Sequence, residues 1–262
     1  MRIVSWNTNG LRGTLKAGMW QPFLDATKPD VICIQETKSE SSQLPSDFPG
    51  KGWHAYYSWS KVKKGYSGVA IITSIEPSSV VEGIGIKKFD DEGRTITAFF
   101  APKKKGGKLL ALVNCYFPNG GGGPHRLEYK LEFYDAFLKY VEKLKKKYIV
   151  IFTGDVNTAH TEIDLARPKE NVDNTGFLPI ERAWLDSVVK HGWTDIFRLY
   201  NPDARDVYTY WDQKTFARAR NVGWRIDYFF AEAQAKKIVK HITTHTDVLG
   251  SDHCPISLDI DI

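Results

Sequence analysis

The sequence has few cysteines, and their number is odd. Only three of the 262 residues are cysteine, and each lies within or beside an apolar stretch. A set this sparse cannot build the disulfide framework that stabilises small secreted proteins. We therefore expect Cys33, Cys115 and Cys254 to be reduced core residues of an intracellular, cytoplasmic protein.

Long apolar runs, leader segments and linkers are also missing. No apolar run approaches the roughly 20 residues needed to cross a bilayer. The N-terminus shows no basic segment followed by an apolar stretch, the pattern of a secretion signal. No Gly/Ser/Pro linker divides the chain, and no repeat of solenoid period is visible. We predict a single domain over residues 1–262, no membrane contact and, because no exposed apolar stripe is evident, a monomer.

The composition suits a well-packed globular protein with a slight excess of positive charge. Hydrophobic residues make up 42% and aromatic residues 13% of the chain, which is ample for a large core. Lys and Arg number 36 against 31 Asp and Glu, a net charge of +5. This balance favours a polyanionic partner, although many ordinary proteins share it.

Apolar segments alternate with helical patterns along the chain. Several of the apolar segments are continuous, which is typical of strands covered on both faces. Helices are predicted over 126–146, from apolar residues at three- and four-residue spacing, and over 179–192, where proline suits a first turn. The pattern predicts an α/β fold in which two sheets pack face to face between helices. The predicted strands are 2–6, 31–35, 67–73, 95–101, 109–116, 148–153, 225–230 and 256–260.

Polar side chains gather where five of these strands begin or end. Buried carboxylates at such positions are costly unless they are paired or bound to a metal. Taken singly, an Asp and Asn after a strand more often form an Asx turn, and a lone His is more often structural. Five clusters of the same kind favour one shared site. They contain Asn7 and Asn9, Glu36, Asp155 and Asn157, Asp227, and Asp252 with His253.

The residue types in these clusters indicate which metal they could bind. Carboxylates and amides without thiolates favour a hard cation, Mg²⁺ or Mn²⁺, over Zn²⁺. Mg²⁺ keeps several waters and often needs only one or two protein carboxylates. Glu36 is the best single ligand candidate, supported by Asn7 and Asp252.

At this level of detail the chain resembles a known family. The strings SWNTNGLR, QETK, KGYSGVA, YFPNG, GDVNTAHTEIDLARPKEN, GFLPIERAW, NVGWRIDYF and GSDHCPI are similar to those of the exonuclease III / class II abasic-site endonucleases, within the endonuclease–exonuclease–phosphatase superfamily. The resemblance runs from Arg2 to Ile260. It implies a four-layer αββα sandwich of two packed mixed β-sheets flanked by helices, like deoxyribonuclease I. It also implies Mg²⁺-dependent hydrolysis, with Mn²⁺ a possible substitute, of the phosphodiester 5′ to an abasic site in double-stranded DNA.

The resemblance also implies roles for individual residues. Glu36 matches the principal metal ligand, Asp155 the residue that orients or deprotonates the attacking water, and His253 the imidazole at the phosphate. Asn157 matches the partner of Asp155, and Asp227 the acid that orients the imidazole. Tyr116 matches a phenol that points at the phosphate. The full set of candidate metal-contacting residues is Asn7, Glu36, Asp155, Asn157, Asp252 and His253.

Further matches concern the DNA. An apolar pocket for the flipped abasic sugar would be lined by Tyr210, Trp224 and Ile226. Gly122 and Lys214 stand where some relatives place a DNA-inserting Arg and a Met. The candidate DNA or phosphate contacts are Asn9, Arg12, Lys64, Gly65, Tyr66, Asn119, Asn171, Asn174 and Lys214.

These observations rank the possible functions. First comes an abasic-site endonuclease with 3′→5′ exonuclease and 3′-end-cleaning activity. The same fold could also nick at deoxyuridine or cut a phosphoester outside DNA. A non-catalytic DNA-binding protein is disfavoured because Glu36, Asp155, Asn157, Asp227 and His253 are all present. The basic segment 101–108 is predicted to be an exposed turn.

Overall fold

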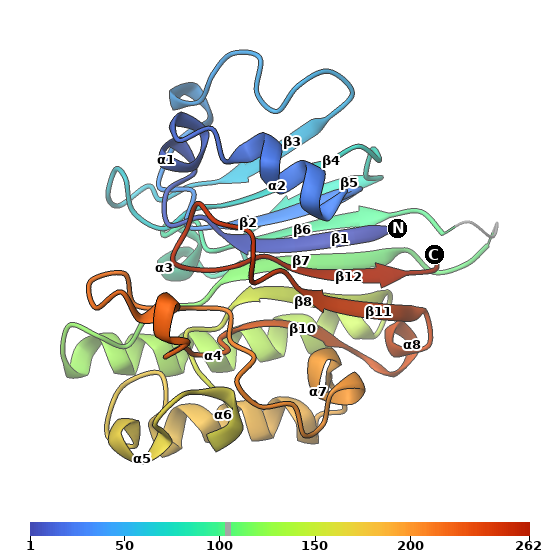
Figure 1. Cartoon of the computed structure of the whole chain (residues 1–262). Coiled ribbons are helices and arrows are strands. Elements are labelled where there is room, and N and C mark those ends of the chain that lie inside the picture. The colour runs from blue at the N-terminus through green and yellow to red at the C-terminus, as the bar shows by residue number, and fades with distance from the viewer. Residues whose placement is uncertain (103–105) are drawn as a thin grey trace.

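The fold is built on two six-stranded sheets. The computed structural model describes residues 1–102 and 106–262 (Figure 1). The first sheet has the strand order β11-β12-β1-β2-β4-β3. Within it, β1 and β2 are parallel and the other neighbours are antiparallel. The bounds are β1 Arg2–Asn7, β2 Val31–Gln35, β3 His54–Ser58, β4 Val69–Thr73, β11 Val239–Thr244 and β12 Ile256–Ile260.

The second sheet is mixed in the same way. Its order is β5-β6-β7-β8-β10-β9, with β7 and β8 parallel. Apolar side chains from both sheets interlock between them, so every central strand is covered on its inner face. The bounds are β5 Ser79–Glu82, β6 Thr95–Phe100, β7 Leu110–Tyr116, β8 Ile149–Asp155, β9 Thr194–Asp195 and β10 Asp227–Ala231.

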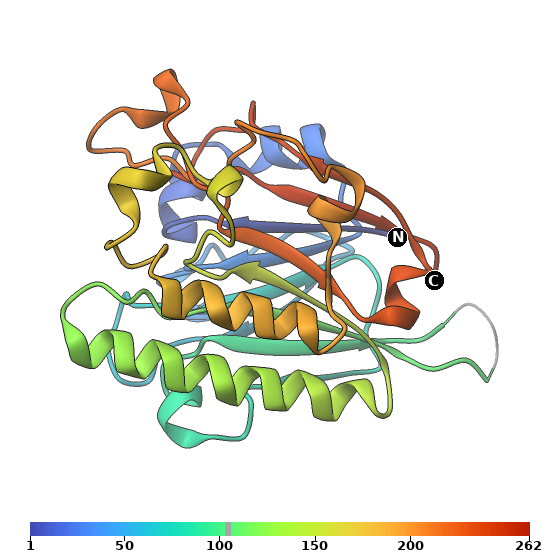
Figure 2. The ribbon, with the colours of Figure 1, turned by 90° about the horizontal axis from the view of Figure 1, so that it is seen from below.

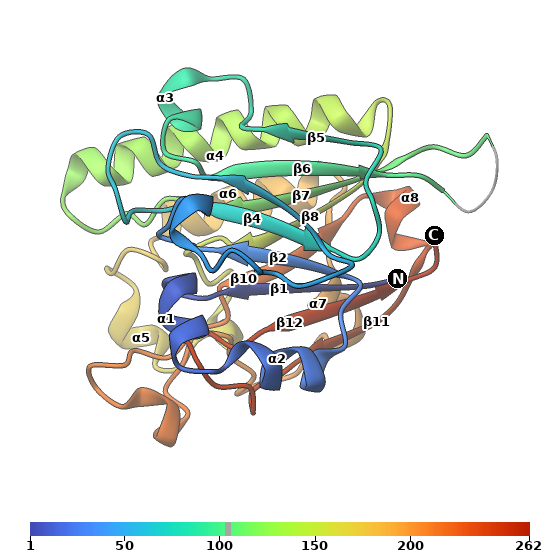
Figure 3. The ribbon, with the colours of Figure 1, turned by 90° about the horizontal axis from the view of Figure 1, so that it is seen from above.

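Helices cover the outer faces of both sheets. On the first sheet, α2 packs through Phe23 against Trp6 of β1, with the rings 4.6 Å apart, and Figure 3 shows α1 and α2 on this side. Figure 2 shows α4 and α6 side by side over the second sheet. The predicted four-layer α/β sandwich is thereby confirmed. The α-helices are α1 Leu11–Lys16, α2 Trp20–Thr27, α3 Lys87–Asp90, α4 Pro124–Lys145, α5 Pro168–Asn171, α6 Pro179–Lys190, α7 Ile196–Tyr200 and α8 Ala233–Lys236.

The two long helices follow the sequence pattern closely. Helix α6 begins at Pro179 as predicted, since proline needs no amide partner in the first turn. Helix α4 begins at Pro124, two residues before the predicted start, for the same reason. Of the apolar residues whose spacing predicted this helix, Tyr134, Leu138 and Val141 are buried, but the first turns differ from the prediction. Leu127 and Leu131 are only half-buried, whereas Lys130, Phe133 and Phe137 are fully buried.

A polar link joins the sheets just below their shared edge. The Nε2 atom of Gln35 donates to Asn114 Oδ1 of the opposite sheet at 2.7 Å and to Ser5 Oγ at 2.9 Å. Asn114 Nδ2 in turn donates to the carbonyls of Ile34 and Ala70. Buried polar groups that hydrogen-bond from one sheet to the other in this way favour one arrangement of the two sheets over shifted alternatives. The link therefore positions the strand ends directly above it.

Three other predictions concern the chain outside the site. All three cysteines are free thiols and buried, as predicted. Among the described residues, no helix is both long enough and apolar enough to cross a bilayer. Residues 103–105 of the basic segment 101–108 lie outside the part of the chain that the structure describes.

Candidate active site

Strand ends from the two sheets meet at one edge of the sandwich. β1 and β12 carry the chain termini at one end and site residues at the other, since Asn7 ends β1 and His253 precedes β12 (Figure 1). In the second sheet Asp155 ends β8 directly opposite Asp227, which begins β10. Asn7 joins the two sheets, because its Nδ2 donates to Glu36 Oε1 at 3.0 Å and to Asp155 Oδ2 at 2.9 Å.

The backbone conformation at the end of β8 positions these side chains. Gly154 allows β7 and β8 to pack closely, because a Cβ there would lie 1.9 Å from the carbonyl oxygen of Cys115. Asn157 adopts a left-handed conformation with φ of 55°, which Asn tolerates better than most residues. Its backbone N–H donates to Asp155 Oδ1 at 2.8 Å. The turn after β8 thus holds one oxygen of Asp155, while Asn7 holds the other.

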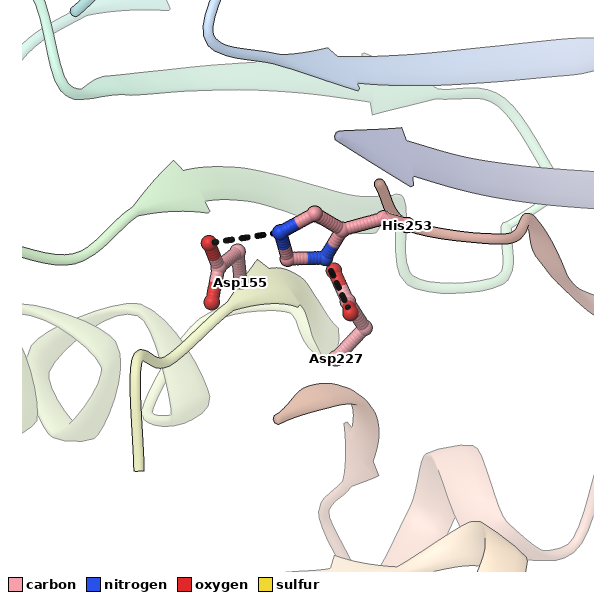
Figure 4. A group of neighbouring side chains, drawn as sticks. All are labelled: Asp155, Asp227 and His253. Atoms are coloured by element: carbon pink, nitrogen blue, oxygen red, sulfur yellow. Dashed lines mark hydrogen bonds and ion pairs between the residues drawn. The ribbon is translucent and has the colours of Figure 1, made fainter. Parts of the chain in front are cut away.

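The imidazole of His253 lies between two carboxylates, as Figure 4 shows. Its Nδ1 is 2.8 Å from Asp227 Oδ2, and its Nε2 is 3.8 Å from Asp155 Oδ2. Burial alone would lower the pKa of the imidazole. The charge and hydrogen bond of Asp227, with the charge of Asp155, outweigh this and raise the pKa to about 10. His253 is therefore an imidazolium at neutral pH.

The pKa values of Asp155 and Glu36 are shifted in opposite directions. Burial raises the pKa of Asp155, the imidazolium of His253 opposes it, and nearby Asp227 and Glu36 add to it, which places the pKa at about 7. Burial by itself would raise the pKa of Glu36 as well. There, Lys38 Nζ lies 2.8 Å from Glu36 Oε2, and this ammonium with the Asn7 hydrogen bond lowers the pKa below its ordinary value. Lys38 also contacts the side chain of Asn9.

Tyr116 and Asp252 complete the polar rim. Burial and the charges of Glu36 and Asp155 raise the pKa of Tyr116 well above its usual range, so its hydroxyl stays protonated. The Arg94 guanidinium lies 5.0 Å from the centre of its ring. Asp252 Oδ2 accepts from Asn9 Nδ2 at 3.0 Å.

These groups open into one cleft of about 370 Å³. One wall is apolar, since Trp224 and Ile226 line it beside Tyr210, whose ring centre is 4.9 Å from that of His253. The backbone of Tyr210 pairs with that of Trp224 and that of His253 in isolated antiparallel β-bridges, which places this wall next to the imidazole. The lining residues predicted from sequence are Glu36, Tyr116, Asn119, Asp155, Asn157, Tyr210, Trp224, Ile226, Asp252 and His253.

Of the predicted DNA contacts, Asn119 lines the cleft and the others lie outside its lining. Asn119 donates to Asn157 Oδ1 at 3.0 Å, at the mouth. Tyr66 is placed differently from its neighbours, because its hydroxyl accepts from Arg94 at 2.7 Å and Arg126 at 3.0 Å and is partly buried. It anchors the loop that carries Lys64. Among the described residues, those outside the cleft lining are Asn9, Arg12, Lys64, Gly65, Tyr66, Asn171, Asn174 and Lys214.

Sequence reasoning missed a buried ion pair behind the site. Lys130 Nζ lies 2.6 Å from Glu181 Oε1, and both side chains are fully buried. Lys130 also donates to the carbonyl of Asn157 at 2.8 Å, and Glu181 accepts from the backbone N–H of Gly176 at 2.6 Å. The pair thus supports two walls of the cleft. A lysine three residues before Phe133 and four before Tyr134, on the buried stripe of α4, was the available signal. Thr175, Gly176 and Asp212 also line the cleft and were not predicted.

Comparisons with known proteins agree with this geometry. Residues 4–253 match the model of the Endonuclease/Exonuclease/phosphatase family. The chain is 39% identical over 262 residues to an exodeoxyribonuclease of Bacillus subtilis, with 100% of both chains covered. It is 38% identical over 265 residues to a DNA-(apurinic or apyrimidinic site) endonuclease of Dictyostelium discoideum, covering 100% of this chain and 71% of that one. The crystal structure of an AP endonuclease from Leishmania major superposes with a TM-score of 0.89 at 29% identity, covering 100% and 87% of the two chains.

Proposed function

The chain belongs to the endonuclease/exonuclease/phosphatase family as a hydrolytic DNA-repair nuclease, and we propose that it cuts the phosphodiester 5′ to abasic sites in duplex DNA. The observation that carries this proposal is the position of Asp155. It is a buried carboxylate 3.8 Å from an imidazolium, in a cleft whose next wall is apolar. The cleft thus combines a base, a cationic contact for the phosphate and a pocket for a sugar without its base, each of which this reaction uses.

We propose Mg²⁺, with Mn²⁺ as a possible substitute, as the cofactor. The carboxyl groups of Glu36, Asp155, Asp227 and Asp252 outnumber the two cationic groups beside them, Lys38 and His253, and a divalent cation would offset the excess of negative charge. Glu36 already attracts the ammonium of Lys38, so its position favours a cation. The metal would supply Lewis-acid stabilisation of the phosphate and leaving oxygen.

Two groups of residues could bind the metal ion, and we assign its ligands to the group around Glu36. Asp155, Asp227 and His253 have ligand atoms within 4.8 Å of one another. An imidazolium has no free lone pair, however, and the hydrogen bond to Asp227 keeps His253 protonated. We therefore propose that Glu36 holds the ion, with Asn7 and Asp252 close by, and that His253 contacts phosphate.

The protein's own groups can then carry the proton and the charge. Asp155 accepts a proton from the attacking water, since its pKa near 7 matches neutral conditions. Asn7 and the backbone N–H of Asn157 orient its two oxygens. The imidazolium of His253 stabilises the negative charge that grows on the phosphate. Asp227 keeps that imidazole charged and correctly turned.

The apolar wall suits an abasic sugar. This wall is formed largely by apolar surface, the side chain of Ile226 and the rings of Tyr210 and Trp224, so a sugar lacking its base fits against it with less desolvation of polar groups. A nucleotide without a paired base is also easier to rotate out of the helix. These two effects together favour incision at abasic sites over intact DNA.

An incision assay tests the proposal. A 5′-labelled duplex with one tetrahydrofuran abasic analogue is expected to be cut 5′ to the analogue with Mg²⁺ and not with EDTA. Asp155→Asn should cut about 10³-fold more slowly, whereas Asp203→Asn, which changes an exposed carboxylate, should cut like the wild type. Equal cutting by Asp155→Asn, or no cutting by the wild type, would contradict the proposal.

We also propose 3′→5′ exonuclease and 3′-end-cleaning activity by the same site; the Bacillus relative is named an exodeoxyribonuclease, which supports exonuclease activity. A 3′ end in the cleft presents the same phosphodiester to Asp155 and His253. Duplexes with a recessed 3′ end, with a 3′ phosphate and with a single deoxyuridine measure these alternatives in the same assay. Loss of exonuclease activity in Asp155→Asn, in parallel with incision, is the expected result.

We propose finally that the enzyme acts as a cytoplasmic monomer. Its three thiols are free and buried, which suits a reducing compartment. Light scattering of the purified protein should give the mass of one 29.8 kDa chain, and a dimer mass would contradict this point.

A further inference from the structure

A second hollow lies on the outer face of the second sheet and shares no lining residue with the catalytic cleft. It has a volume of about 430 Å³ and lies between the C-terminal half of α4 and β5, the edge strand of the sheet (Figure 3). Phe99 lies at its floor, and Val81 and Ile86 line one side. Val81 is 46% exposed and Ile86 is 39% exposed. Apolar surface gathered in a hollow is typical of a binding surface.

The hollow is already formed in the folded chain. The hydroxyl of Tyr140 is hydrogen-bonded to Thr97 Oγ1 at 2.7 Å, which fixes the tyrosine of the helix against the sheet. The ring centre of Tyr148 lies 4.8 Å from that of Phe99. Tyr140 and Tyr148 both line the hollow. A partner therefore does not have to order this surface, which lowers the cost of binding it.

Strand β5 offers backbone hydrogen bonds on its outer side, because it pairs with β6 alone. The N–H of Gly83 donates to the carbonyl of Thr95 at 2.8 Å, and alternate residues of an antiparallel pair face the partner strand. Val81 therefore also faces β6, whereas Val80 and Glu82 direct their N–H and C=O groups outward. The strand contains neither lysine nor proline, the residues that commonly block such an edge. Edges of this kind accept an extended peptide as an additional strand.

The charge of the hollow indicates which peptide. Lys139, Lys143 and Lys147 line it, and its lining contains no acidic residue. The three lysines are exposed and lie four residues apart, so they form a row along one side of the hollow. Within residues 1–102 and 106–262 none of the three forms an ion pair, whereas Lys145 lies 2.6 Å from Glu142. Ammonium groups beside apolar surface are complementary to a segment that carries both carboxylates and apolar side chains.

Two other partners fit these features less well. A second copy of the chain would present the same surface, so the lysine rows of the two copies would meet and repel. A DNA backbone would attract the lysines but would leave the apolar side chains of Val81 and Ile86 and the edge of β5 without a partner. An acidic, partly apolar peptide segment matches the lysines, the apolar surface and the strand edge together.

We propose that the hollow and the outer edge of β5 dock an extended acidic segment of a partner protein. Its carboxylates lie along the lysine row, and its apolar side chains pack against Val81 and Ile86. The spacings are compatible, since lysines four residues apart on a helix are about 6 Å apart and every second residue of a strand is about 7 Å apart.

This docking site goes beyond the proposed function and does not depend on it. Lys130 of the same helix supports the wall of the catalytic cleft through the carbonyl of Asn157. Lys143 lies about 20 Å further along α4, at 1.5 Å per residue. A partner in the hollow therefore leaves the catalytic cleft open to DNA.

A peptide titration tests the site. The probe is a fluorescein-labelled peptide of three Leu-Val-Glu-Asp repeats, in which apolar and acidic side chains alternate on each face of a strand. A control peptide carries Lys in place of every acid. Fluorescence anisotropy at physiological salt should show saturable binding of the acidic peptide to the wild type and none of the basic one. Bound peptide should also slow hydrogen–deuterium exchange at the amides of Val80 and Glu82. Equal binding of both peptides, or no binding of the acidic peptide up to millimolar concentration, would overturn the proposal.

Three variants locate the binding surface. Lys143→Glu should weaken peptide binding roughly fivefold, the effect of losing one exposed charge pair and adding a repulsion. Val81→Ser should weaken it by a similar factor through lost apolar contact. Lys146→Glu makes the same charge change on the adjoining exposed turn, outside the hollow, and should bind like the wild type. All three should keep the wild-type melting temperature and incision rate, because these side chains are exposed. Equal weakening by Lys143→Glu and Lys146→Glu would show unspecific attraction and overturn the site.

The two other partners give different results in the same experiments. Displacement of the peptide by an abasic duplex would make the hollow a DNA contact. A dimer in light scattering that Val81→Ser abolishes would place a second copy there. Either result overturns the proposal, whereas peptide binding to a monomer, unchanged by saturating duplex, supports it.

Discussion

The two sheets bring carboxylates of the same chemistry to one cleft, yet the two acids end up with opposite properties. Glu36, from the first sheet, has Lys38 at 2.8 Å and a lowered pKa. Asp155, from the second sheet, faces Asp227 and Glu36 as well as His253, and its pKa is raised to about 7. The difference comes from neighbours, because both groups are largely buried.

This contrast assigns different tasks to the two acids. A carboxylate that stays ionised throughout the working pH range is suited to holding a cation, whereas one that titrates near neutrality is suited to exchanging a proton. Asn7 hydrogen-bonds to both, so the two halves are coupled through one amide. Substitutions of Glu36 and of Asp155 should therefore reduce activity in ways that can be distinguished.

The largest effect is expected at Asp155. In Asp155→Asn the amide oxygen can still accept from the N–H of Asn157, but no base remains. We expect kcat for abasic incision to fall by about 10³-fold, within the range that a positioned base contributes. Additional Mg²⁺ should not restore activity. Single-turnover incision over a range of Mg²⁺ concentrations measures this, and restoration by metal would place Asp155 with the ligands.

A smaller loss, visible mainly at high pH, is expected at Asp227. Without this partner the pKa of His253 should drop from about 10 towards 6.5. Its positive charge, and with it activity, should then be lost as the pH rises through that lower value, and roughly 30-fold should be missing at pH 8, where only a few per cent of the imidazole would remain charged. The pH–rate profile of Asp227→Asn should show its descending limb moved to lower pH. A profile parallel to that of the wild type would show that the charge on His253 is not needed.

The wild-type profile should fall on the acid side as well. As the pH drops below about 7, Asp155 is protonated and can no longer act as base, so kcat/KM should fall about tenfold for each further pH unit. A divalent cation nearby lowers the pKa of a carboxylate. The acid limb of the pH–rate profile should therefore move to lower pH as the Mg²⁺ concentration rises. If its position does not change with Mg²⁺ concentration, Asp155 does not lie close to the bound cation.

A substitution of Glu36 should instead impair the enzyme by weakening its binding of the metal ion. Glu36→Gln keeps the size of the side chain but loses the charge, so we expect apparent Mg²⁺ affinity to weaken by roughly 10- to 100-fold. Incision at high Mg²⁺ should recover much of the wild-type rate. Mn²⁺ binding followed by electron paramagnetic resonance gives the affinity independently of activity, and unchanged Mn²⁺ binding would contradict the assignment.

Sequence reasoning found the centres of the sheets and missed their borders. Eight strands were predicted with ends within a few residues, and all eight exist. The four missed strands, β3, β5, β9 and β11, are the four edge strands. An edge strand has one unpaired side and much exposed surface, so it carries neither a continuous apolar run nor a clear alternation.

The site shows the same division between local signals and three-dimensional ones. Glu36, Asp155 and His253 were recognisable because each lies at the end of an apolar strand within a distinctive string. Lys130 and Glu181 contribute through burial and through bonds to backbone groups far along the chain, which no local pattern encodes. The opposite pKa shifts of Glu36 and Asp155 likewise depend on distances that only the fold determines.

Stability provides the finest test of the contrast between the two acids. Because the pKa of folded Asp155 lies above its ordinary value of 3.8, the folded protein keeps a proton that the unfolded chain releases, and stability falls as the pH rises from about 4 to 7. The lowered pKa of Glu36 has the opposite sign, since its charge stabilises the fold above its ordinary pKa of 4.5. Without metal at pH 8, Asp155→Asn should therefore melt above the wild type and Glu36→Gln below it, each by about 2 to 4 °C, the response of a chain of this size to about 1 kcal/mol. At pH 5 the gain of Asp155→Asn should shrink while most of the loss in Glu36→Gln remains. Calorimetry at the two pH values measures this, and shifts of the same sign in both variants would mean that packing, not charge, distinguishes these two carboxylates.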